Sequence, residues 1–143
     1  LKTVVDSGAV IIGHNVETVP SLYRVRKNAS YKRSLQVLKR LKELGGDKIK
    51  TKSALMVGLG ETEEEMVQVF KDLLEVGCKF LSIGQYLAPS GDYETVKEFV
   101  KPEQFERYKQ IALDLGFDFV HSTPYARSSY LAHEYLSNEK NTI

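Results

Sequence analysis

Two polar residues near the N-terminus have the types and spacing to bind a nucleotide-like ligand. Asn15 and Glu17 lie two positions apart after the apolar run that ends at Ile12, so in an extended chain both side chains would face the same way. An amide beside a carboxylate suits ribose hydroxyls or the charged groups of an amino acid. The alternative is a solvated loop in which both side chains make local turn hydrogen bonds.

A second motif, Gly58-Leu59-Gly60, follows the apolar run Ser53–Val57. Glycines let the backbone approach a planar or anionic ligand closely, and the N-terminus of a following helix would add unpaired amides. The alternative is a tight turn between a strand and a helix, because one glycine-rich turn is a weak fingerprint. Lys52 and Ser53 open the run before this turn, and Lys52 would share a face with Ala54.

Short apolar runs alternate with helical patterns along the chain, which predicts βα units and a parallel sheet. Thr62 and Glu65 form a capping-box pattern at the start of one helix. The first eight residues are interpreted as the end of a helix, and residues 128–137 as a short helix. We expect strands at 9–12, 53–57, 80–83 and 117–120, and helices at 31–44, 62–77 and 102–115. The polar motifs therefore follow strands at their carboxyl ends, where α/β folds gather their chemistry.

The composition is that of an ordinary globular protein, with 143 residues of which 42% are hydrophobic and 27% charged. The formal net charge is +1, with 20 basic and 19 acidic side chains interspersed, so neither nucleic acid nor a membrane is indicated as a partner. There is no apolar run of about 18 residues. The single cysteine, Cys78, allows no internal disulfide and favours the cytoplasm.

Taken together, the motifs resemble the lipoyl synthases, radical enzymes that use S-adenosylmethionine (SAM). The resemblance follows the same order along the chain from about Ala9 to Ala132. It is carried by the segments His14–Pro20, Thr51–Ser53, Leu55–Thr62, Gly84–Leu87 and Arg127–Tyr130.

This resemblance implies an α/β fold, namely half of a partial (βα)6 radical-SAM, TIM-like barrel with parallel strands and outer helices. Residues 1–121 would form the βα units, and residues 122–143 a C-terminal extension. The family uses SAM and two 4Fe-4S clusters. Reductive cleavage of SAM yields a radical that abstracts hydrogens at C6 and C8 of a protein-bound octanoyl chain, and the auxiliary cluster then donates two sulfur atoms.

The resemblance also implies roles for individual residues. Asn15 and Glu17 would lie near the ribose and methionyl groups of SAM, and the turn from Gly58 to Gly60 beside adenine. Lys52 and Ser53, in the family's Thr-Lys-Ser motif, are assigned to cofactor binding. Ser129, directly before the tyrosine, would bind one iron of the auxiliary cluster through its hydroxyl oxygen.

The implied partners are an octanoylated lipoyl domain or a glycine-cleavage H-type carrier protein, and an electron donor such as ferredoxin or flavodoxin. The family's Cys-x3-Cys-x2-Cys motif and its N-terminal cysteine triplet are absent from this sequence. The chain is therefore interpreted as the C-terminal half of a lipoyl synthase, inactive in isolation. The alternative is a non-catalytic α/β nucleotide-binding module, or a subunit completed by an N-terminal partner.

Overall fold

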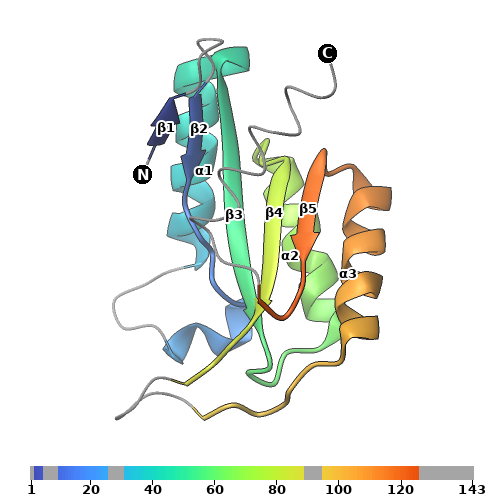
Figure 1. Ribbon diagram of the computed structural model, residues 1–143. Coiled ribbons are helices and arrows are strands. Elements are labelled where there is room, and N and C mark those ends of the chain that lie inside the picture. The colour runs from blue at the N-terminus through green and yellow to red at the C-terminus, as the bar shows by residue number, and fades with distance from the viewer. Residues whose placement is uncertain (1, 5–9, 26–30, 89–94, 126–143) are drawn as a thin grey trace.

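The computed structural model describes residues 2–4, 10–25, 31–88 and 95–125, and its main feature is a sheet with strand order β1-β2-β3-β4-β5 (Figure 1). The strands are β1 (Lys2–Val4), β2 (Val10–Gly13), β3 (Ile49–Val57), β4 (Phe80–Gln85) and β5 (Phe119–Ser122). The helices are α1 (Tyr31–Gly45), α2 (Glu63–Glu75) and α3 (Pro102–Leu115), with short 3-10 turns at Pro20–Val25 and Gly46–Lys48.

Strands β2 to β5 are parallel, and the sheet is not closed. This arrangement confirms the predicted partial α/β barrel. The prediction for the N-terminus was wrong, because Lys2–Val4 is a strand that pairs antiparallel with β2 rather than the end of a helix. The edge of β2 that does not pair with β3 gives this segment its backbone hydrogen-bond partners. The helix expected at 128–137 lies outside the described residues.

One face of the sheet carries the helices and the other does not. Along β3 the buried residues alternate with half-buried ones from Thr51 on, and the buried apolar residues Leu55 and Val57 lie in a common core with side chains of all three helices. In Figure 1 the helices lie behind and beside the sheet, while the carboxyl ends of β2 to β5 point to the bottom of the view. Lys52, Ala54 and Met56 therefore belong to the face without helices.

All four predicted strands differ in their bounds from the observed ones: β2 is shifted by one residue, β4 extends to Gln85, and β3 and β5 differ most. Strand β3 begins at Ile49 instead of Ser53, because its first residues pair with β2. Strand β5 begins at Phe119 instead of Phe117. Phe117 is buried and packs edge-on against Phe70, with ring centroids 6.2 Å apart, so it belongs to the turn that ends α3.

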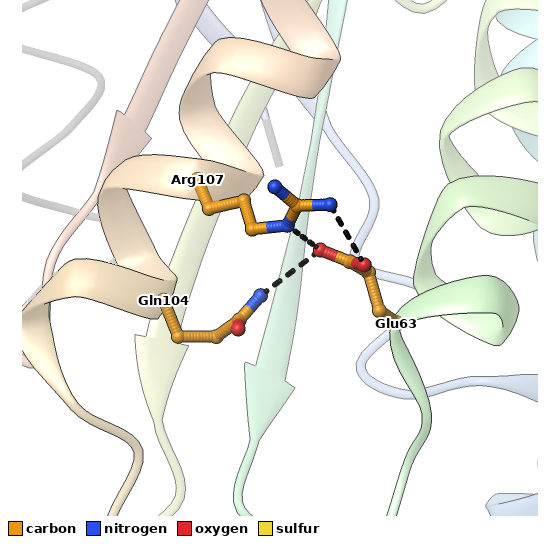
Figure 2. Close-up of polar contacts among 3 residues, drawn as sticks. All are labelled: Glu63, Gln104 and Arg107. Carbon is orange, nitrogen blue, oxygen red and sulfur yellow. Dashed lines mark hydrogen bonds and ion pairs between the residues drawn. The ribbon is translucent and has the colours of Figure 1, made fainter.

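The N-terminus of α2 is fixed by both local and distant contacts. The predicted capping box is present: the amide of Glu65 donates to Thr62 Oγ1 and the amide of Thr62 donates to Glu65 Oε1, at 3.1 and 2.9 Å. Glu63 accepts hydrogen bonds from Gln104 and Arg107 of α3 (Figure 2). These contacts hold the two helices, and the loops before them, in register at the carboxyl edge of the sheet.

Candidate functional site

A cavity of about 440 Å³ opens at the carboxyl edge of the parallel strands. Its volume falls within the range typical of small-molecule sites, and its position is the one that open α/β sheets use for ligands. The lining residues come from the segment after β2, from β3 and β4, and from the loops after β4 and β5. They are Asn15, Glu17, Ala54, Leu55, Met56, Ser82, Gly84, Gln85, Leu87, Pro124 and Tyr125.

Asn15 and Glu17 both line this cavity, as their spacing predicted. The segment that carries them runs along β3, since the Glu17 amide donates to Ala54 O at 2.9 Å and the Met56 amide donates to Glu17 O at 2.7 Å. Glu17 is the one non-glycine residue with a positive φ in the described part of the chain, at 74°. Such a backbone costs about 1–3 kcal/mol and often marks a functional site.

Val16 explains how the chain presents these two side chains. Its side chain is fully buried in the core, and its amide donates to Ser53 Oγ at 3.0 Å. Ser53 is itself buried on the helix side of β3. Ser53 therefore binds the Asn15–Glu17 segment from the helix side of the sheet and does not line the cavity.

Lys52 lies on the face without helices, two residues before Ala54, and it does not line the cavity. Its stem packs over Gly13, where an added Cβ would meet Lys52 Cε at 2.7 Å. Partial burial lowers the pKa of this ammonium from its ordinary value. The assignment of Lys52 and Ser53 to cofactor binding stays a prediction.

The amides of the Gly58-Leu59-Gly60 turn bind a carboxylate of this chain. The Gly58 amide donates to both oxygens of Glu61 at 3.1 and 3.0 Å, and the Leu59 amide donates to Glu61 Oε1 at 3.0 Å. An internal anion thus occupies the position that an anionic ligand would take. Neither glycine lines the cavity, so this geometry favours the tight-turn alternative, and contact of Gly58 or Gly60 with adenine stays a prediction.

Gly58 is required by the approach of the protein's own chain. Its φ is +99°, and an added Cβ would lie 2.3 Å from Gln85 Nε2 and 2.4 Å from Glu98 O. The amides of Lys97 and Glu98 donate to Gly58 O at 2.7 and 3.2 Å. The segment before α3 therefore packs directly on this turn.

Several lining residues were not predicted as site residues. Met56 pairs with Gly84 and Ala54 with Ser82 in the register of β3 and β4. Because side chains alternate between the two faces of a sheet, these four residues lie on the same face, the one without helices. Pro124 and Tyr125 follow β5, whose carboxyl end meets the same edge. No sequence signal marks this last pair.

The described residues do not fit an iron–sulfur cluster. No group of three histidine, cysteine, aspartate or glutamate side chains among them could hold a metal ion. Cys78 is fully buried, and burial raises the pKa of its thiol to about 12, so it is not a thiolate ligand. Ser129, the predicted iron ligand, lies outside the described residues.

Comparison with known proteins gives the family. Residues 1–73 match the model of the Radical SAM superfamily. The chain belongs to the radical SAM superfamily. Within this superfamily it is 57% identical over 135 residues to the lipoyl synthase of Geobacter metallireducens, a match that covers 94% of this chain and 47% of the relative. It is 54% identical over 138 residues to the lipoyl synthase of Caldanaerobacter subterraneus subsp. tengcongensis, covering 96% of this chain and 48% of the relative.

This radical SAM chain thus spans about half the length of the curated relatives it matches. The lipoyl synthase of Alkaliphilus metalliredigens shows the same relation, with 52% identity over 141 residues that cover 98% of the chain and 48% of the relative. Among the helices described, none combines the length and the apolar character needed to cross a membrane.

Proposed function

We propose that this chain forms the SAM-binding carboxyl edge of a lipoyl synthase, which inserts two sulfur atoms at C6 and C8 of a protein-bound octanoyl chain. The observation that carries the proposal is the cavity in which Asn15 and the strained Glu17 lie together. The superfamily match and the similarity to lipoyl synthases over nearly the whole chain support it.

The polar groups of the cavity fit SAM. Glu17 is the one carboxylate in the lining, and Asn15 and Ser82 add an amide and a hydroxyl. A carboxylate accepts hydrogen bonds from ribose hydroxyls or from an ammonium group, and the amide can both donate and accept. Ala54, Met56 and Leu87 supply the apolar surface that a planar base requires.

When bound, SAM would supply the radical that removes hydrogen from the octanoyl chain. The residues of this chain would hold SAM by Glu17 and Asn15 and shield it from water with Leu87 and Tyr125. Ser129 of this chain is the proposed ligand to one iron of the auxiliary cluster, whereas the cysteine ligands of the clusters would come from outside this chain. The proposed partners are an octanoylated lipoyl domain or glycine-cleavage H-type carrier protein, and an electron donor such as ferredoxin or flavodoxin.

The test replaces the matched part of the Geobacter metallireducens relative by this chain, so that the rest of that enzyme supplies what the chain lacks. Lipoyl formation on an octanoylated lipoyl domain is then measured together with 5′-deoxyadenosine. We expect both products from the hybrid. A soluble hybrid loaded with its clusters that forms neither product would refute the proposal.

Variants of the hybrid separate the two proposed roles. Glu17→Gln should weaken SAM binding about 5- to 10-fold, because it replaces a charged hydrogen bond worth about 1.5–3 kcal/mol by a neutral one worth about 0.5–1.5 kcal/mol, whereas the exposed Glu64→Gln should not. Ser129→Ala should keep 5′-deoxyadenosine formation and lose the lipoyl product, while Ser128→Ala should be much milder. Normal lipoyl formation by Ser129→Ala would remove the ligand assignment.

A further inference from the structure

Gln85, at the end of β4, is a wall residue of the cavity whose carboxamide makes three hydrogen bonds within the protein. Its Nε2 donates to Tyr86 O and to Glu98 O, both at 2.9 Å. Its Oε1 accepts from the Val100 amide at 2.8 Å. Both amide protons and one carbonyl lone pair are therefore used, and the side chain has no donor to offer to a ligand.

These bonds join two places that are far apart along the chain. Tyr86 is the first residue after β4, and Glu98 and Val100 lie just before α3 begins at Pro102. The Gln85 carboxamide thus holds the start and the end of the β4–α3 connection together. The side chain of Val100 enters the core, and the amides of Lys97 and Glu98 donate to Gly58 O.

The backbone amides of Gln85 and Tyr86 bind the segments that follow or end the two neighbouring strands. The Gln85 amide donates to Pro124 O at 3.3 Å, and the Tyr86 amide donates to Val57 O at 2.8 Å. Pro124, Tyr125 and Leu87 line the cavity beside Gln85. Gln85 and Tyr86 together therefore join the end of β3, the start of the loop after β4 and the loop after β5.

We propose that Gln85 is a positioning residue of the SAM site: its carboxamide fixes residues 97–100 on the Gly58 turn, and the same bonds hold Gln85 in its place in the cavity wall beside Leu87 and Pro124. It acts through these segments and not by contact with the reacting groups. Its effect on SAM rests on the proposed function, whereas its effect on residues 97–100 does not.

The test uses Gln85→Glu and Gln85→Met in the 143-residue chain, with the exposed Gln36→Glu as a control for added charge. A carboxylate at position 85 would face two carbonyl oxygens, whereas the protonated acid could donate to one of them and still accept from Val100. NMR hydrogen exchange measures protection of the Lys97, Glu98 and Val100 amides between about pH 5 and 8, normalised for intrinsic exchange.

We expect protection in Gln85→Glu to fall about 10-fold as the pH rises, because ionisation removes the one hydrogen bond that the protonated acid donates and places the carboxylate against two carbonyl oxygens. Protection of these amides in Gln85→Met should be low at every pH, and in wild type and Gln36→Glu it should not change with pH. A purely steric role of the side chain would give no such pH dependence. Unchanged protection in both Gln85 variants would overturn the proposal.

A SAM titration, followed by the amide chemical shifts of Glu17 and Ser82, tests the effect of Gln85 on SAM binding. Affinity in Gln85→Glu should fall at least about fivefold above the midpoint of the protection change and recover below it. Reduced protection with unchanged affinity would refute a role in the SAM site. If wild type shows no SAM-dependent shifts at all, the proposed cofactor site of this chain fails, while the exchange data still decide the role of Gln85 in holding residues 97–100.

Discussion

Replacing Gly58 by alanine should destabilise the fold far more than the same change at Gly60. Both glycines have a similar left-handed backbone, with φ of +99° and +107°. Each alanine therefore has a similar strain of about 1–2 kcal/mol, offset by about 0.4–1 kcal/mol because alanine restricts the unfolded chain. For Gly60 the expected net loss is about 1 kcal/mol, since an added Cβ meets nothing closer than Lys97 Cγ at 3.9 Å.

At Gly58 the surroundings add a second and larger cost. The new Cβ would lie 2.3 Å from Gln85 Nε2 and 2.4 Å from the backbone oxygen of Glu98. Relief requires Gln85 or residues 97–98 to withdraw, and each hydrogen bond lost in this way is worth about 1 kcal/mol. With two or three bonds lost, Gly58→Ala should cost about 3–4 kcal/mol in total.

Urea denaturation of the two variants measures this difference directly. The midpoint should fall for both, with the larger fall for Gly58→Ala and an unchanged m-value. The difference between the two free energies of unfolding isolates the steric term, because the backbone strain is shared. If the two variants lie within about 0.5 kcal/mol of each other, the packing of residues 97–98 on this turn does not carry the energy assigned to it.

Three further changes test other parts of the structure. Glu17→Gly should raise the free energy of unfolding by about 0.5–1 kcal/mol through relief of its positive φ and weaken SAM binding, whereas Glu17→Gln should weaken binding without stabilising the fold. The hydrogen bond from Ser21 and those from Thr62 lower the pKa of Glu65. The carboxylate should therefore stabilise the fold fully above the unfolded carboxyl pKa, and this stabilisation should be lost as the pH falls through the lower folded pKa. In acid unfolding of Glu65→Gln this loss should disappear, and in Glu64→Gln it should persist. A double-mutant cycle between Arg107 and Glu63 should give a small coupling that weakens in salt, because the pair is exposed. A coupling unaffected by salt would contradict this.

The sequence determined those features whose contacts lie within a few residues. The capping box joins Thr62 and Glu65, which are three positions apart, and the bounds of the helix that it begins were predicted to within two residues. The alternation of apolar runs with helical patterns was enough for parallel βα units, and the order of the motifs pointed to the radical SAM superfamily. The position of Asn15 and Glu17 at the carboxyl edge of the sheet followed from the alternation of strands and helices, because parallel strands bring their carboxyl ends together.

Only the tertiary structure decided how these elements meet. The bonds of Gln85 to Glu98 and Val100 span 13 and 15 residues, and the bond between the Val16 amide and Ser53 spans 37. No local pattern encodes such distances, since they depend on which strands pair and in which register. The glycine turn shows the same limit. Its residues suit an approaching ligand or an approaching chain equally well, and only the structure shows that residues 97–98 pack on Gly58.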